Sequence, residues 1–172
     1  GKKKIYIKKK LPNGKIYNEL IKSYTVSILT SVIRKKFYMK LQKKFDHRFS
    51  IIGDFDLFLR LSKVCVFKSI TTPLAFYRIH GKNLSVIKKE VEIQELETWL
   101  KENKSALNEA QTRKLQKNIA YKKFISYKID GKYRECIHIL FYSQVGLFSI
   151  KNLVIFFTPT IILKQLFWLY KD

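Results

Sequence analysis

Two aspartates that flank a single phenylalanine are the residues of this chain best suited to acid–base chemistry. Asp54 and Asp56 stand at the start of an apolar segment, residues 57–61. That segment is too uniformly hydrophobic for a two-faced surface helix, so it predicts a short helix that is buried on most sides. A carboxylate at a helix start faces the positive end of the dipole and can also cap free N–H groups. From its position alone, Asp54 is therefore either a helix cap or a general base.

A third charged residue follows on the same predicted helix. Arg60 comes four residues after Asp56, the spacing at which two side chains meet on one helix face. The simplest interpretation of this pair is a partly buried ion pair. In the alternative interpretation, Asp56 belongs to the substrate site.

Further polar residues end the next predicted extended segments. The β-branched residues within 64–70 predict a strand that Pro73 closes, and residues 74–77 predict a second short extended segment. Arg78 and His80 follow in a polar turn. A lone histidine is usually structural or merely exposed, but one that lies between Arg and Gly at a strand end can meet an anion or a metal.

These two stretches together resemble a known family. Residues 53–61 read Gly-Asp-Phe-Asp-Leu-Phe-Leu-Arg-Leu, and residues 73–85 read Pro-Leu-Ala-Phe-Tyr-Arg-Ile-His-Gly-Lys-Asn-Leu-Ser. The pattern resembles the C-terminal half of a family 2 glycosyltransferase with the GT-A fold. Residues 11–16 and 45–46 also stand where that family has similar residues, so the resemblance covers about residues 11–90. The two motifs are fairly specific together and weak apart.

The resemblance implies an inverting transfer of a sugar from a nucleotide-sugar donor to the hydroxyl of a glycan or lipid-linked acceptor, in bacterial surface glycan or polysaccharide biosynthesis. It implies that Asp54 is the general base and that His80 binds the divalent cation or the donor diphosphate. Arg78 and Asp56 become candidates for binding the donor diphosphate or the acceptor, although Arg78 could equally pair with a carboxylate. The family usually has Glu where Gly53 stands, which removes any role of that Glu but leaves Asp54 in place.

A second implication concerns the donor side. In the family, an Asp-x-Asp motif holds the metal, Mn²⁺ or Mg²⁺, and no such motif occurs here before residue 54. We therefore expect the chain to be a fragment that lacks most of the donor site, with the metal belonging to the missing donor-binding half, and we expect the isolated chain to be inactive. A non-catalytic remnant that binds an acceptor or a membrane is the alternative function.

The composition favours an anionic partner. Among 172 residues, 35 are basic and 13 acidic, which gives a formal charge of +22. A phosphorylated donor or an anionic membrane surface fits this excess. Nucleic acid is not expected, because the charge is spread along the chain without an Arg-rich stripe or an aromatic stacking motif. Cys65 and Cys136 lie in apolar settings, as reduced thiols of a cytosolic protein do. The expected location is cytoplasmic and peripheral at the inner face of the plasma membrane.

The predicted fold class is α/β, with residues 1–90 as the C-terminal half of a GT-A (Rossmann-like) domain and residues 91–172 as an α-helical extension. Residues 153–170 carry one charge, and three alternatives stay open for them: an interfacial helix, a core helix and a membrane span. The other predicted elements are a helix at 17–24, a strand at 26–33, and helices at 37–44, 87–104, 107–129 and 133–142.

Overall fold

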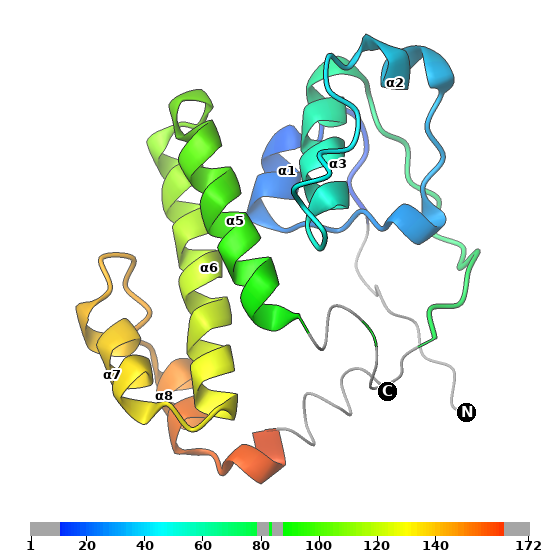
Figure 1. Ribbon diagram of the computed structural model, residues 1–172. Coiled ribbons are helices and arrows are strands. Elements are labelled where there is room, and N and C mark those ends of the chain that lie inside the picture. Colours follow the sequence, from blue (N-terminus) through cyan, green and yellow to red (C-terminus); the bar gives the residue numbers. More distant parts are fainter. Residues whose placement is uncertain (1–10, 79–82, 84–87, 164–172) are drawn as a thin grey trace. The chain divides into compact units, whose positions relative to one another are not determined.

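The computed structural model describes residues 11–78, 83 and 88–163 of the chain. The chain divides into two compact units, Gly1–Ser85 and Val86–Asp172. Each unit has its own helices (Figure 1).

The first unit is built around one central helix, α3. Its described elements are α1 (Tyr17–Lys22), η1 (Ile28–Thr30), α2 (Lys35–Lys40) and α3 (Gly53–Val64). Leu57, Phe58, Leu59 and Leu61 of α3 are almost completely buried, which confirms the prediction of a helix covered on most sides. Both α1 and α2 contact α3 (Figure 1). This burial stabilises α3 and fixes the position of the two aspartates in its first turn.

The second unit consists of antiparallel helices. Its elements are α5 (Lys89–Asn103), η2 (Lys104–Ala106), α6 (Glu109–Ile129), α7 (Tyr133–Tyr142) and α8 (Ile150–Phe157). The helices α5 and α6 lie side by side, and α7 folds back along α6 (Figure 1). A reciprocal capping box between Asn108 and Gln111 starts α6. The core contains Phe124, Cys136, Ile139, Leu140 and Leu147. The helices predicted at 87–104, 107–129 and 133–142 are confirmed.

The predicted α/β class is wrong. The described part of the chain is helical and contains no strand or sheet, so the GT-A half expected for residues 1–90 is overturned. Within residues 26–33, where we predicted a strand, the short helix η1 forms instead. Residues 74–77 are exposed, and 64–70 contribute one isolated antiparallel bridge between Gly14 and Phe67. Strands are stabilised by neighbouring strands, and β-branched residues without such a partner adopt extended backbone only.

The C-terminal tail is described up to residue 163. Asn152 of α8 is buried and donates to the Leu147 carbonyl at 2.6 Å, and Ile155 and Phe156 pack against the core of the second unit. Residues 164–170 of the segment 153–170 lie outside the described residues. Within the described ranges, every helix is too short or too polar to cross a membrane.

Candidate functional site

The first turn of α3 carries the two aspartates that the sequence analysis singled out. The helix starts after Ile52, and no side chain of that residue caps it. Asp54 and Asp56 therefore stand in the first turn, where the helix dipole favours a negative charge. The two side chains have different surroundings, and this difference separates their roles.

Asp54 is partly exposed. Its Oδ1 atom accepts a hydrogen bond from the backbone N–H of Phe55 at 2.7 Å. The rest of the helix is anchored in the core, so the Asp54 backbone is held in place while the residue stays partly exposed. A general base needs this combination of a fixed position and contact with substrate.

Tyr24 is the neighbour of Asp54 that the sequence analysis did not assign to the site. Its ring meets the ring of Phe55 edge to face, with the centroids 5.4 Å apart. Its hydroxyl is buried and has no hydrogen-bond partner among the described residues. Burial raises the pKa of Tyr24 far above its ordinary value, and the charge of Asp54 raises it further. The Tyr24 hydroxyl and the Asp54 carboxylate thus lie close enough to interact electrostatically.

The hydroxyl of Tyr24 therefore remains protonated and is a donor without an acceptor. A buried unsatisfied donor costs about 1–3 kcal/mol, so such groups commonly have a ligand or water as their partner. Tyr24 could donate to a substrate oxygen or to the Asp54 carboxylate once a ligand is bound. The sequence placed Tyr24 on the apolar side of the predicted helix at 17–24, but it gave no signal for the proximity to Asp54.

Asp56 faces into the protein. It is 6% exposed, and its Oδ2 accepts a hydrogen bond from Nε of Arg60 at 3.0 Å. The Arg60 guanidinium also donates to the carbonyl oxygens of Lys43 and Lys44. Asp56 and Arg60 thus form the expected ion pair, and this pair fastens the loop before α3 to the helix.

Asp46 organises the same loop. Its carboxylate binds Arg48 and Lys43, and it accepts a further hydrogen bond from the Arg48 backbone N–H at 3.1 Å. The hydrogen bond from Arg48 is the main reason why the pKa of Asp46 lies well below its ordinary value, with Lys43 adding to the effect. Asp46 is covered mainly by these two cations, whose side chains are about half exposed. The loop therefore holds its shape through charges near the surface.

The structure does not bring the remaining predicted site residues to Asp54. Arg78 is exposed in an extended segment, where its carbonyl accepts from Asn83. His80, the predicted metal residue, lies outside the described residues. Within the described ranges no group of three or more His, Cys, Asp or Glu side chains could hold a metal ion. Because His80 is not among the described residues, its binding of the divalent cation that the resemblance implies stays a prediction, and we assign no step to that cation.

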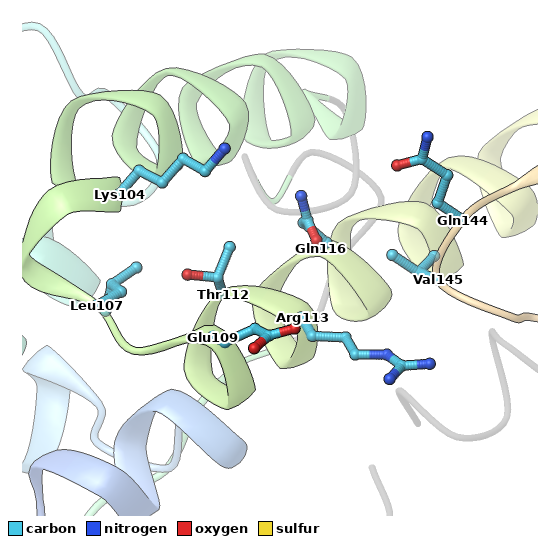
Figure 2. A pocket seen from close by; sticks show the side chains of 8 residues that line it. All are labelled: Lys104, Leu107, Glu109, Thr112, Arg113, Gln116, Gln144 and Val145. Carbon is cyan, nitrogen blue, oxygen red and sulfur yellow. The ribbon is translucent and has the colours of Figure 1, made fainter.

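A pocket of about 570 Å³ lies in the second unit and contains none of the predicted site residues. Its lining comes from η2, the start of α6 and the loop after α7 (Figure 2). The pocket is wide open, and its charged lining residues are Lys104, Glu109 and Arg113. These side chains point in different directions around the rim rather than converging on one point (Figure 2). The pocket therefore lacks the convergent polar groups that a specific ligand site needs.

Comparison of the chain with models of known protein families, with curated proteins and with solved structures finds no match.

Proposed function

We propose that this chain supplies the acceptor side of an inverting glycosyl transfer, in which Asp54 is the general base. The observation that carries the proposal is a partly exposed aspartate at the start of a helix whose body is buried. The sequence pattern around Asp54 supplies the reaction class. The donor would be a nucleotide sugar and the acceptor a glycan or lipid-linked hydroxyl, with the reaction at the cytoplasmic face of the membrane.

In the proposed step, the Asp54 carboxylate takes the proton of the acceptor hydroxyl. The acceptor oxygen forms a bond to the anomeric carbon as the bond from that carbon to the nucleoside diphosphate breaks. The electron pair of the broken bond leaves with the diphosphate, and attack from the opposite side inverts the anomeric centre. Tyr24 would keep its proton and donate a hydrogen bond from its hydroxyl to an oxygen of the acceptor or to the Asp54 carboxylate.

The test uses the complete gene product with a panel of radiolabelled nucleotide sugars and a membrane extract as the acceptor source. We expect Asp54→Asn to lower the transfer rate about 10²–10⁴-fold, the usual loss when a general base is removed. Glu19→Gln is the matched control, because Glu19 is an exposed carboxylate in the first turn of α1. Transfer by Asp54→Asn at the parental rate would refute the role of Asp54, and no transfer from any donor would refute the function.

A non-catalytic binding module is the second candidate. It is favoured by the formal charge of +22, which suits an anionic membrane surface. In that case the complete gene product would bind acceptor or membrane with unchanged affinity in the Asp54→Asn variant, and it would release no nucleoside diphosphate.

A further inference from the structure

A basic surface on the first unit is independent of the proposed chemistry. We define the α2 surface by six residues: Val32, Arg34, Lys35, Lys36, Met39 and Lys40. All six side chains are exposed; Val32 is 100% exposed and Met39 59%. The surface thus joins four cations to two aliphatic side chains within nine residues of sequence.

The α2 surface keeps its outward direction because the other side of α2 is packed. Leu41 at the end of α2 is buried, and Phe37 and Tyr38 are half-buried. Lys44 donates to the carbonyl oxygens of Tyr38 and Leu41 at 2.9 and 2.8 Å, which satisfies the C-terminal end of α2. The next loop is held to α3 through the hydrogen bonds from Arg60 to the Lys43 and Lys44 carbonyls. The four cations of the α2 surface therefore lie on backbone that is held in place by packing and hydrogen bonds.

The cations of the α2 surface differ from those of the following loop. Lys43 and Arg48 are bound to Asp46. No carboxylate of the described residues pairs with the four cations of the α2 surface, and Lys36 and Lys40 lie only against the ring of Phe37, 5.2 and 5.8 Å from its centroid. The whole first unit has 20 basic and four acidic residues, so its charge is strongly positive. This surface is thus complementary to an anionic partner.

The two aliphatic residues, Val32 and Met39, distinguish between two possible anionic partners, a nucleic acid and a membrane. A nucleic acid is recognised by cations together with aromatic rings that stack on bases. Here the rings of Phe37 and Tyr38 are half-buried beneath lysine side chains, whereas Val32 and Met39 are exposed. Phosphates offer no contact for exposed aliphatic groups, but the boundary between lipid headgroups and acyl chains offers both charges and apolar contact.

We propose that the α2 surface docks the protein on membranes that contain anionic phospholipids. Arg34, Lys35, Lys36 and Lys40 bind the headgroup phosphates, and Val32 and Met39 enter the acyl boundary. Phe45 lies beside the start of α3, with its Cδ1 atom 3.7 Å from the position of a Cβ on Gly53, and it is 48% exposed. The α2 surface is thus followed in the chain by the loop that leads to the start of α3.

The test measures partition of the full chain onto vesicles of phosphatidylcholine alone and with about 30% phosphatidylglycerol. The variant Arg34→Gln/Lys35→Gln/Lys36→Gln/Lys40→Gln removes the four cations. Each cation near an anionic surface contributes about fivefold, so we expect the preference for phosphatidylglycerol vesicles to fall on the order of 100-fold or more. The matched control removes one arginine and three lysines that are exposed in the second unit: Lys101, Arg113, Lys114 and Lys117. Its preference for phosphatidylglycerol vesicles should stay within about threefold of the parental chain, because the α2 surface is left intact.

Two further arms complete the test. Val32→Ser/Met39→Ser should weaken the binding that survives high salt, because screening removes the attraction of charges but not apolar insertion. A short single-stranded DNA is the probe for the rejected partner. Equal loss in the α2 variant and the control, or an unchanged preference in the α2 variant, would overturn the proposal. DNA binding that is tighter than vesicle binding and lost in the α2 variant would also overturn it. If the fourfold variant does not fold, Lys35→Gln/Lys36→Gln replaces it. Because this variant removes two of the four cations, its preference for phosphatidylglycerol vesicles should fall by about the square root of the factor expected for the fourfold variant.

Discussion

Replacement of Asp56 by alanine tests the assignment of the Asp56–Arg60 pair to structure rather than to chemistry. The change leaves the Arg60 guanidinium without its carboxylate while it still binds the Lys43 and Lys44 carbonyls. Breaking a fully buried ion pair from one side costs about 3–5 kcal/mol. The Asp56 side chain is 9% exposed and that of Arg60 26%, so water screens the remaining charge in part. We therefore expect α3 to lose about 2–3 kcal/mol of protection.

Hydrogen exchange followed by mass spectrometry is the suitable assay, because it resolves α3 from the second unit. A loss of 2–3 kcal/mol makes the protected amides of α3 exchange roughly 30- to 150-fold faster, since every 1.4 kcal/mol is a factor of ten. The control is Glu92→Ala, which breaks the more exposed pair between Glu92 and Lys122 at 2.8 Å. That pair should be worth less than about 1 kcal/mol.

The double variant Asp56→Ala/Arg60→Met removes both charges and should be less unstable than the sum of the single variants, because no unpaired charge remains. Exchange in α3 that is unchanged by Asp56→Ala would refute the structural role. If sugar transfer were lost with unchanged exchange, Asp56 would belong to the substrate site.

Three other predictions concern single side chains. Asp46→Asn should make the free energy of unfolding fall less steeply with pH below about pH 4. A carboxylate whose pKa is lowered in the folded state stabilises the fold above its unfolded pKa, and this stabilisation is lost as pH falls. An unchanged acid-unfolding curve would contradict this. Tyr24→Phe removes an unsatisfied hydroxyl, so the free energy of unfolding in urea should stay equal or rise. The same change should raise the lower apparent pKa in the pH profile of the transfer rate. An unshifted pH profile would exclude Tyr24 from the site. Lys128 is 3% exposed, and its Nζ lies 4.6 Å from the ring centroid of Tyr133 and 5.5 Å from that of Phe156. Lys128→Met should therefore lower the free energy of unfolding in urea by about 1–2 kcal/mol. Parental stability in this variant would show that these contacts contribute nothing.

Local patterns in the sequence were sufficient to predict α3, α5, α6 and α7. The dense apolar run after Asp56 predicts a buried helix, and the four-residue spacing to Arg60 predicts the ion pair; the structure contains both. Both features depend on side chains within one or two helical turns of each other, where geometry follows directly from the 3.6-residue period.

Contacts between distant segments could not be predicted in the same way. The segment 64–70 has the composition of a strand, but a strand also needs a partner, and the pairing found is one bridge between Gly14 and Phe67. The bonds from Arg60 to the Lys43 and Lys44 carbonyls span 17 and 16 residues, and Tyr24 is 30 residues away from Asp54. No periodicity relates such positions, because the path of the intervening chain decides whether they meet.

The role of Asp54 as general base is the central claim of this account. The most direct measurement is the pH dependence of sugar transfer by the complete gene product, for the parental protein and for Asp54→Asn, with binding of the nucleotide sugar measured in parallel. We predict that the asparagine variant binds the donor with unchanged affinity, loses about 10²–10⁴-fold in rate, and no longer shows the rise in rate with pH that ionisation of a carboxylate causes. Parental transfer with an unchanged pH profile in the variant would contradict the claim.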